Sequence, residues 1–364
     1  MKIYQHVDEF KEGDGIGNDI KGLFSLFWKI GYDSAVVARK SEVSDDIPII
    51  YPGSNLKFQK DDIHILHYGG YRYDTFFFLC AKGKKILRFH NTTPSSFFYG
   101  HTLPEVYDSL EFSELKSSIE MRDISENISF SFHDSEFNLY TYEKYAAKGN
   151  YSRNKGFRNA LVIPIVRNYG ITGIGKKEVK NYRIGFVGRF VPNKKIEDLV
   201  TLLFILKKID KRYRLVLIGK LNPVFGMYYD SLLRAISSLG LGESVEIHGN
   251  LNDEDASAIL SGLDFYVSMS EHEGFGIPVL EAFAAGVPVL AYHSTAIPKT
   301  MRGGGILFRQ KKIPYLAEMI DLINSRKGLK NKIVESQFKA LEYYNTFPFR
   351  EKIQEMIQAV QIEN

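Results

Sequence analysis

Two glutamates, Glu273 and Glu281, stand eight residues apart in the segment SEHEGFGIPVLE. The segment follows an apolar run at 264–269 that is typical of a buried strand, and it leads into a predicted helix whose Pro278 suits the first turn. In an open α/β sheet, ligands bind beside the carboxyl ends of the strands. A carboxylate that accepts hydrogen bonds from two hydroxyls can hold a vicinal diol. The spacing indicates that one glutamate binds a ribose and the other a sugar; incidental acids on a surface helix are the alternative.

The turn between the two glutamates is built from Gly274, Phe275 and Gly276. Because glycine has no Cβ atom, this turn lets backbone N–H groups approach a ligand closely. The N-terminus of the helix that follows carries partial positive charge and favours an anion such as a diphosphate. The turn is therefore a candidate anion site beside two carboxylates that can bind hydroxyls.

A second loop, GRFVPNKK, also follows a predicted strand and precedes a predicted helix. It starts at Gly188 and carries Arg189 and Lys194. Arg189 can bind a diphosphate through two parallel N–H bonds, and Lys194 can bind it as a point charge. Surface cations at the end of a strand are the alternative. Strands of one parallel sheet bring both loops to the same edge, which favours a shared anionic ligand.

Two weaker signals lie in the first half of the chain. Gly15 and Gly17 occur in GDGIGN after the first predicted strand, but Asn18 stands where a dinucleotide-binding G-x-G-x-x-G loop has its third glycine. A plain turn therefore remains open there. His90, in RFHNTTP, ends another predicted strand. A histidine in that position can hydrogen-bond a reacting sugar or phosphate, although lone histidines are usually structural.

Other chemistries lack support in the sequence. GITGIGKK at 170–177 resembles a P-loop, but Lys177 replaces the Ser/Thr that would hold magnesium. The acids at 253–255 directly precede an apolar-periodic stretch, so we interpret them as helix-capping residues rather than a metal pair. The single cysteine, Cys80, excludes an internal disulfide and a thiolate-rich zinc site. No serine-hydrolase or zincin motif occurs. We expect no metal and no cofactor.

The chain has 364 residues, more than the roughly 250 to 300 that one hydrophobic core supports, so two domains are expected. Strand and helix patterns alternate in both halves, which predicts parallel sheets and an α/β fold with two Rossmann-like domains. We expect an N-terminal domain at 1–166, a linker at 167–181, a C-terminal domain at 182–346, and a helix at 347–364 that packs back toward the N-terminal domain.

The expected elements follow from apolar periodicity. In the second half, strands are expected at 183–190, 214–219, 245–249, 264–269 and 288–292, and helices at 196–209, 228–239, 253–260 and 278–285. In the first half, strands are expected at 2–7, 34–37, 63–68, 85–89, 128–132 and 161–164, and a helix at 18–30.

The net charge of +4 is unevenly divided. Residues 1–165 hold 20 Lys/Arg against 22 Asp/Glu, and the remaining residues hold 27 against 21. A net charge this small over 364 residues does not indicate that the protein binds nucleic acid. The N-terminus lacks the apolar core of a signal peptide, and no window reaches the roughly 18 apolar residues of a membrane span. We therefore expect a cytoplasmic protein.

One run of cations has no intervening acid. Such a run is typical of a solvated face, but it also suits an anionic acceptor or anionic headgroups on the inner face of the membrane. Its members are Lys144, Lys148, Arg153, Lys155 and Arg158.

Taken together, EGFGIPVLEAFAAGVPVLA and GRFVPNKK resemble the retaining glycosyltransferases of family 4. The family has the GT-B fold, in which two Rossmann-like domains face a central cleft. GDGIGN, RFHNTTPSSFF, HDSEFN and YVSMSEHEGFG look most like mannosyltransferases of bacterial and archaeal surface polysaccharide synthesis. The resemblance extends over essentially the whole chain. It implies an acceptor-side N-terminal domain, a C-terminal domain that binds a nucleotide sugar, and hexosyl transfer without metal.

The resemblance also implies roles for the C-terminal residues. Arg189 and Lys194 would neutralise the donor diphosphate as it leaves. Glu281 would hold the ribose hydroxyls and Glu273 the donor sugar. The backbone that helps Glu273 hold the sugar is that of Phe275, Gly276 and Ile277.

In the N-terminal domain, Gly15 and Gly17 would let a loop close over the diphosphate, and His90 would lie near the reacting sugar. Transfer in such enzymes retains the anomeric configuration, by a front-face route in which the leaving phosphate takes the acceptor's proton. The expected donor is GDP-mannose and the expected acceptor a glycan or a lipid-linked glycan. The loop at 219–222 reads GKLN where many relatives have GDGP, which keeps a UDP-sugar open. A nucleotide-sugar epimerase or hydrolase and a catalytically silent sensor also remain open.

Overall fold

The computed structural model describes residues 1–11, 13–43, 46–53, 57–71, 75–146, 159–171, 180–249 and 251–362. Contacts divide the chain into two compact units. Unit 1 comprises Met1–Pro94, Leu110–Arg167 and Thr346–Asn364. Unit 2 comprises Ser95–Ser109 and Asn168–Asn345. The segment Ser95–Ser109, which we expected in the N-terminal domain, groups with unit 2 because its aromatic side chains pack there. Most of the expected linker, at 172–179, lies outside the described residues.

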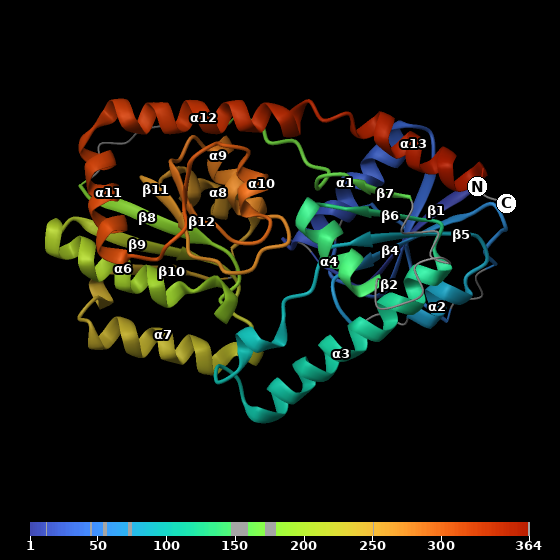
Figure 1. The fold of residues 1–364 in the computed structure, drawn as a ribbon, viewed down its shortest axis with the longest axis horizontal. Coiled ribbons are helices and arrows are strands. Elements are labelled where there is room, and N and C mark those ends of the chain that lie inside the picture. Colours follow the sequence, from blue (N-terminus) through green and yellow to red (C-terminus); the bar gives the residue numbers. More distant parts are fainter. Residues whose placement is uncertain are drawn as a thin grey trace. The chain divides into compact units, whose positions relative to one another are not determined.

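Unit 1 contains a seven-stranded sheet whose strands are all parallel (Figure 1). The strand order is β3-β2-β1-β4-β5-β6-β7. The strands are β1 (Lys2–Phe10), β2 (Asp33–Ser41), β3 (Ile49–Ile50), β4 (Ile63–Tyr68), β5 (Lys84–Phe89), β6 (Phe130–His133) and β7 (Ala160–Val162). The helices of this part of the chain are α1 (Gly15–Lys29), α2 (Thr75–Cys80), α3 (Pro104–Asn127), α4 (Glu136–Ala146) and α13 (Phe349–Ile362). The order reverses between β1 and β4, and such a switch point is where open α/β sheets bind ligands.

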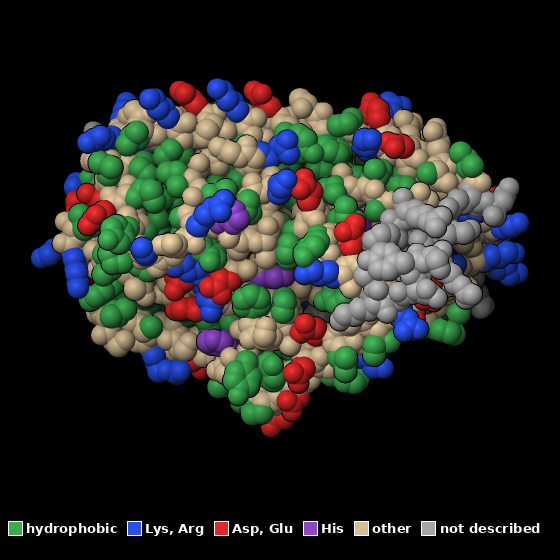
Figure 2. Space-filling view, viewed as in Figure 1, with side chains coloured by type: hydrophobic (Ala, Val, Ile, Leu, Met, Phe, Trp, Pro, Cys, Tyr) green, Lys and Arg blue, Asp and Glu red, His purple; other side chains and the backbone are tan. Residues whose placement is uncertain are grey.

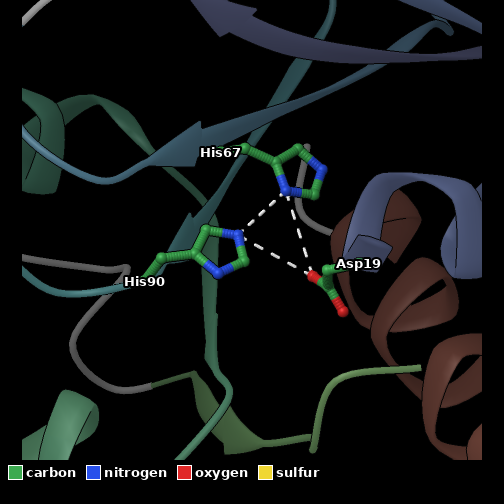
Figure 3. A group of neighbouring side chains, drawn as sticks. All are labelled: Asp19, His67 and His90. Carbon is green, nitrogen blue, oxygen red and sulfur yellow. Dashed lines mark hydrogen bonds and ion pairs between the residues drawn. The ribbon is translucent and has the colours of Figure 1, made fainter. Parts of the chain in front are cut away.

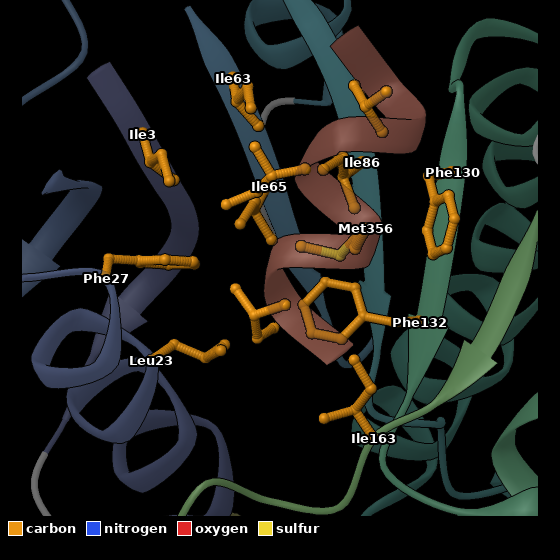
Figure 4. Close-up of a cluster of buried hydrophobic side chains, with 13 residues drawn as sticks. Ile3, Leu23, Phe27, Ile63, Ile65, Ile86, Phe130, Phe132, Ile163 and Met356 are labelled. Atoms are coloured by element: carbon orange, nitrogen blue, oxygen red, sulfur yellow. The ribbon is translucent and has the colours of Figure 1, made fainter. Parts of the chain in front are cut away.

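The main apolar core of unit 1 joins the two ends of the chain (Figure 4). Leu23 and Phe27, four residues apart on α1, face apolar side chains of β1, β4, β5 and β6. Helix α13 adds four buried side chains at helical spacing: Ile353, Met356, Ile357 and Val360. The C-terminal helix is therefore part of the core of unit 1.

Unit 2 contains a six-stranded parallel sheet with the order β10-β9-β8-β11-β12-β13. Its strands are β8 (Tyr182–Val187), β9 (Tyr213–Ile218), β10 (Val245–His248), β11 (Phe265–Ser268), β12 (Val289–Tyr292) and β13 (Ile306–Phe308). Its α-helices are α6 (Ile196–Ile209), α7 (Gly226–Ser238), α8 (Asp253–Ser261), α9 (Ile277–Ala284), α10 (Ile297–Met301), α11 (Ile313–Ser325) and α12 (Lys327–Asn345). Four short 3-10 turns complete the elements used below: η1 (Ser95–Phe98), η3 (Pro192–Lys194), η4 (Pro223–Phe225) and η5 (Gly242–Ser244).

The observed elements differ from the expected ones in definable ways. Helix α1 begins at Gly15 rather than at Asn18, because Asp14 caps it. Helix α3 was not expected, since only four of its side chains are buried: Ser117, Met121, Ile124 and Ser125. A helix that buries so little shows no continuous apolar stripe in its sequence.

On the face in Figure 2, Lys and Arg side chains are interspersed with Asp and Glu rather than gathered in one patch. Within the described residues, no helix combines the length and the apolar character that crossing a membrane requires.

Candidate functional site

The two loops singled out in unit 2 meet through an ion pair. Nζ of Lys194, in η3 after β8, lies 2.5 Å from Oε1 of Glu273, in the loop between β11 and α9. The side chains are only 11% and 17% exposed, respectively, so solvent screens this pair less than a surface pair. A positive and a negative group are therefore fixed side by side at the carboxyl edge of the sheet of unit 2.

Burial lowers the pKa of the Lys194 ammonium from its ordinary value, and the neighbouring Glu273 carboxylate opposes that shift. The guanidinium of Arg189, which is exposed at the start of the same loop, lowers the pKa further. Lys194 and Arg189 are thus close enough to act on each other electrostatically. An incoming anion would be attracted by both cations and would strengthen the charged form of Lys194.

Asn193 links the same two loops through polar contacts. Its side-chain amide donates to the carbonyl of His272 at 3.0 Å, and its own carbonyl accepts from the backbone N–H of Glu271 at 2.8 Å. Asn193 is buried, so both bonds are shielded from water. They fix the separation between the loop that carries Lys194 and the loop that carries Glu273.

Three hydroxyls from the segment after β12 hold the Glu273 loop by hydrogen bonds to its backbone. Ser294 Oγ donates to the carbonyl of Ser270 at 2.6 Å, and Thr300 Oγ1 donates to the carbonyl of Phe275 at 2.6 Å. Between them, Thr295 Oγ1 accepts from the N–H of Glu273 and donates to its carbonyl, both at 2.8 Å. The backbone of Glu273 is consequently held at both of its polar atoms.

Thr295 adopts an unusual backbone conformation for that role. Its φ of 43° lies in the left-handed region, which a β-branched residue rarely enters. Such a conformation costs on the order of 1–3 kcal/mol and persists where surrounding contacts enforce it, often at functional sites. The two hydrogen bonds to Glu273 are contacts of that kind.

The turn after Glu273 leads directly into α9. Gly276 caps the helix with φ of 99°, and a Cβ atom there would lie 2.8 Å from Cδ1 of Ile297, so this position suits only glycine. Ile277 opens the helix, and no side chain caps its N-terminus. The first-turn N–H groups of a helix carry partial positive charge, so the stretch from Gly274 through Phe275 to Ile277 fits an anion. On the other loop, Gly188 directly follows β8, and its N–H donates to the carbonyl of Ile218 at 2.9 Å.

Glu281 lies in the second turn of α9 and is partly exposed. Tyr266 on β11 is fully buried, and burial raises the pKa of its hydroxyl well above its usual value. The carboxylates of Glu273 and Glu281 raise this pKa further. Both glutamates of the sequence motif therefore lie near one buried side chain.

The segment Ser95–Ser109 packs on unit 2 next to this loop. The ring centroid of Phe97 lies 5.9 Å from that of His272, and Phe98 lies 5.2 Å from Phe225 in η4. His272 is buried, and burial lowers the pKa of its imidazole to about 4. A neutral imidazole thus precedes Glu273 directly in the chain.

In unit 1, Gly15 and Gly17 of GDGIGN lie in the first turn of α1 rather than in a free loop. Asp14 Oδ1 accepts from the N–H of Gly17 at 2.6 Å, and the helix starts at Gly15. A Cβ atom on Gly17 would lie 1.9 Å from the carbonyl oxygen of Lys11. Gly17 is therefore required by close packing, and contact of Gly15 or Gly17 with a diphosphate stays a prediction.

His90 lies directly after β5, at the carboxyl edge of the sheet of unit 1. Its Nε2 lies 3.0 Å from Nδ1 of His67, and its Nδ1 lies 3.2 Å from Oδ2 of Asp134. The His90 side chain is 5% exposed. Both ring nitrogens are thus engaged by protein groups, a network that the sequence alone did not reveal.

Asp19, His67 and His90 form a group whose ligand atoms could surround a metal ion (Figure 3). Oδ2 of Asp19 lies 3.7 Å from His90 Nε2 and 4.0 Å from His67 Nδ1. Arg88, however, donates to both oxygens of Asp19, at 2.8 and 3.0 Å, with neither side chain exposed. A divalent ion would add positive charge to a carboxylate that a buried cation already neutralises. This buried ion pair argues against a divalent ion between the three side chains.

The cationic run of the sequence is only partly visible. Lys148, Arg153, Lys155 and Arg158 lie outside the described residues. Lys144, in the last turn of α4, has its Nζ 4.3 Å from the centroid of the Tyr140 ring. A membrane or acceptor contact through this run stays a prediction.

Sequence reasoning missed several residues that shape the two sites. Thr295 and Asn193 carry no local motif of their own, although the hydroxyl-rich HSTAIPKT after β12 was a usable signal. In unit 1, HDSEFN contains Asp134, but only the fold shows that it reaches His90. Asp19 lies in the helix expected at 18–30 and His67 in the strand expected at 63–68, but nothing in either pattern marks these two residues for chemistry.

Comparison with known proteins bears on this geometry. Residues 172–339 match the family described as Glycosyl transferases group 1. A GDP-mannose:cellobiosyl-diphosphopolyprenol alpha-mannosyltransferase of Xanthomonas oryzae is 29% identical over 178 residues, which is 47% of this chain and 43% of that relative. The serotype-specific mannosyltransferase WbdA of Escherichia coli is 30% identical over 36% of this chain and 16% of that relative. The matched stretch thus spans less than half of each relative.

Solved structures resemble the chain over nearly its full length. HepE from Anabaena, solved with UDP and glucose, has a TM-score of 0.74 at 16% identity and matches 99% of this chain and 100% of that one. Sucrose-phosphate synthase from Thermosynechococcus elongatus has a TM-score of 0.74 at 14% identity and matches 98% of each chain. These likenesses confirm the expected fold class, an α/β protein of GT-B type with two parallel sheets.

Proposed function

We propose that this chain is a retaining glycosyltransferase that moves mannose from GDP-mannose to a glycan or lipid-linked acceptor, and that it does so in the cytoplasm. The observation that carries the proposal is the buried Lys194–Glu273 pair beside Arg189 and the N-terminus of α9, where the N-cap residue is Gly276. Cations and helix N–H groups suit a diphosphate, and a carboxylate suits sugar hydroxyls.

The chemistry follows from the charges. As the bond between the anomeric carbon and the diphosphate oxygen breaks, negative charge grows on the diphosphate. Arg189 and Lys194 stabilise that charge more strongly in the transition state than in the bound donor, which is what accelerates a reaction. A new bond forms from the acceptor oxygen to the anomeric carbon on the same face, and the acceptor's proton passes to the leaving phosphate. Two protein cations supply the charge that a bridging metal would supply, so the transfer needs no metal.

Glu273 would orient the sugar in this scheme. Its backbone is held by Thr295, and its carboxylate already accepts from Lys194, so little freedom is left to lose when donor binds. Glu281, in the second turn of α9, would hold the ribose hydroxyls. Peripheral contact with anionic lipid through Lys144 and its neighbours in sequence belongs to the same proposal.

The choice of mannose rests on relatives whose names specify GDP-mannose or mannosyl transfer. UDP-glucose or another UDP-sugar is the second candidate, since the fold also resembles HepE solved with UDP and glucose. Screening thermal stabilisation by GDP, UDP and ADP separates these donors, because a ligand stabilises the folded state in proportion to its affinity and concentration. Stabilisation by GDP alone supports the first candidate, and stabilisation by UDP alone supports the second.

A transfer assay tests the activity itself. Donor consumption should require an acceptor and persist in EDTA, and NMR of the product should show an unchanged anomeric configuration. Rapid donor consumption without any acceptor would instead indicate a hydrolase or epimerase. Binding of nucleotides without turnover of any donor would overturn the enzymatic proposal.

A further inference from the structure

Lys311 connects the two loops of the candidate site, although it belongs to none of the motifs in the sequence. It lies between α11 and β13, the edge strand of the sheet of unit 2. Its Nζ donates to Oε1 of Glu271 at 2.7 Å and to Oδ2 of Asp198 at 2.8 Å. Glu271 lies in the loop that carries Glu273, and Asp198 lies in the first turn of α6, just after Lys194. One ammonium group thus bridges the two chain segments that hold the Lys194–Glu273 pair.

The contacts of Lys311 are largely shielded from solvent. Its side chain is 17% exposed, and its Nζ lies 4.8 Å from the centroid of the Tyr292 ring at the end of β12. A cation over the face of an aromatic ring is attracted by the ring electrons. Solvent screens a partly buried ion pair less than a surface pair. Lys311 is therefore held by partners from three separate segments of unit 2.

The two carboxylates that Lys311 binds carry the same charge. Without a cation between them, Glu271 and Asp198 would repel each other. Lys195 also lies near Glu271, but its Nζ is 3.8 Å from Oε2, which is longer than a hydrogen bond. Lys195 balances part of the charge without fixing the carboxylate. Lys311, at hydrogen-bond distance from both acids, converts their repulsion into a defined separation between the loop and the helix.

The backbone transmits this separation to the Lys194–Glu273 pair. The N–H of Glu271 donates to the carbonyl of Asn193 at 2.8 Å, directly before Lys194. Lys195 joins Lys194 to α6 in a left-handed conformation with φ of 52°, which few residues other than glycine adopt. Since only this residue lies between them, Lys194 moves when α6 moves. A shift of Glu271 or of α6 would therefore alter the distance of 2.5 Å between Lys194 Nζ and Glu273 Oε1.

The charges around Lys311 do not make a second anion site. The ammonium groups of Lys311 and Lys195 face the carboxylates of Asp198, Glu197 and Glu271. Because the carboxylates outnumber the cations, this cluster would repel a diphosphate rather than attract it. Any effect of Lys311 on the reaction must come from the positions of other side chains.

We propose that Lys311 is a positioning residue, which sets the distance between Lys194 and Glu273 by binding Glu271 and Asp198 at the same time. The inference rests on the proposed glycosyl transfer for its consequence in catalysis. Without the ammonium of Lys311, the loop loses its attachment to the start of α6. The carboxylate of Glu273 then occupies the productive position for a smaller share of the time, and the rate falls accordingly.

Amide hydrogen exchange tests the link without any assay of activity. Lys311→Met keeps an apolar stem and removes the ammonium. Exchange of the hydrogen-bonded amides of Glu271 and Glu273 should then become faster by about tenfold or more, as expected for local opening of the loop. Exchange in β9 should stay unchanged. Lys312→Met removes the same charge from the exposed neighbouring residue and should leave both regions unchanged.

Two outcomes of this experiment contradict the proposal. Unchanged exchange of the Glu271 and Glu273 amides in Lys311→Met would show that the lysine does not hold the loop. Equal acceleration in the loop and in β9 would show that Lys311 stabilises unit 2 as a whole.

Kinetics test the consequence for transfer. Lys311→Met should lower kcat/KM by about 10- to 100-fold, the cost of misplacing a group that acts on the substrate. Lys311→Arg can donate to both carboxylates and should stay within about threefold of the wild type. In a Glu273→Ala background, Lys311→Met should have no further effect, since no carboxylate remains to be placed. A lysine that only stabilises the fold would lower activity by the same factor in both backgrounds, and that result overturns the proposal.

Glu271→Gln tests the other end of the same contact. It keeps the shape of the side chain and removes the charge that Lys311 binds. Exchange of the Glu273 amide should become faster, and the combination with Lys311→Met should do no more than Lys311→Met alone. Additive effects overturn the proposal. A wild type in which the exchange results hold but no sugar is transferred refutes the proposed function and leaves the link between Lys311 and the loop standing.

Discussion

Nζ of Lys194 lies 2.5 Å from Oε1 of Glu273, and 79 residues separate the two along the chain. The pair joins the loop after β8 to the loop after β11, which are neighbouring strands of the sheet of unit 2. Each side chain balances the charge of the other in a largely buried position. A change at either residue therefore alters both the charge and the geometry of the site. The first two predictions use this relationship.

Glu273→Ala should lower the rate of sugar transfer by about two orders of magnitude or more, the effect typical of losing a group that stabilises a transition state. Circular dichroism should show a retained fold. The thermal midpoint should drop, because the buried Lys194 ammonium loses its partner. Glu254→Ala, which removes an exposed acid from α8, serves as the control and should change neither property. Transfer near the wild-type rate by Glu273→Ala would contradict the assignment.

Arg189→Ala combined with Lys194→Ala should weaken binding of a nucleoside diphosphate by roughly 100-fold or more, since each of the two lost charged contacts is worth about 1.5–3 kcal/mol and a tenfold change is about 1.4 kcal/mol. Isothermal titration with GDP and with UDP measures the effect. Arg234→Ala combined with Lys332→Ala removes the same charge from exposed positions on α7 and α12 and should leave affinity unchanged. Equal affinities in the two double variants would refute the diphosphate site.

Thr295→Val keeps the branched shape but removes the hydroxyl that bonds both backbone atoms of Glu273. The strained backbone at position 295 then loses the contacts that compensate it, so the free energy of unfolding should fall by about 1–3 kcal/mol. The KM for donor should rise as the loop loosens. Thr295→Ser retains the hydroxyl and should stay close to wild type in urea denaturation and in kinetics. If the serine and valine variants behave alike, the hydroxyl does not hold the loop.

Unfolding should become easier in mild acid. Burial lowers the pKa of His272 to about 4, whereas in the unfolded chain its pKa is about 6.5. The unfolded state therefore binds more protons between these values, and stability is complete above about pH 6.5 and is lost as pH falls toward 4. His64, whose pKa burial also lowers to about 4, acts in the same direction. Urea denaturation at pH 7.5 and pH 5 measures the loss.

Phe97→Ala should reduce this acid sensitivity without abolishing it. Removing the ring that packs on His272 lets water reach the imidazole, so its pKa should rise toward the ordinary value. Proton NMR titration of the His272 ring gives the pKa directly. Phe112→Ala, at an exposed position on α3, is the matched control. An unchanged pKa of His272 in Phe97→Ala would show that this contact does not bury it.

Much of the fold follows from the sequence. Period-2 and helical patterns alternate clearly in the second half, and the expected strands there lie within a few residues of β8 to β12. Buried parallel strands and helices with one apolar face impose such patterns locally, so they can be recognised without a structure. Several elements were not expected, among them helix α3, which buries few side chains, and strand β13, which spans only three residues.

By itself, the sequence determined the class of fold, the loops after strands that carry Arg189, Lys194 and Glu273, and the helix that carries Glu281, because strand, loop and helix follow one another within a short stretch of chain. Only the tertiary structure decided which partners they have. Thr295 behind Glu273, and Asp134 beside His90, are reached through space across 22 and 44 residues. Contacts over such separations depend on how strands are ordered in a sheet, and that ordering leaves no mark on the local pattern of residues.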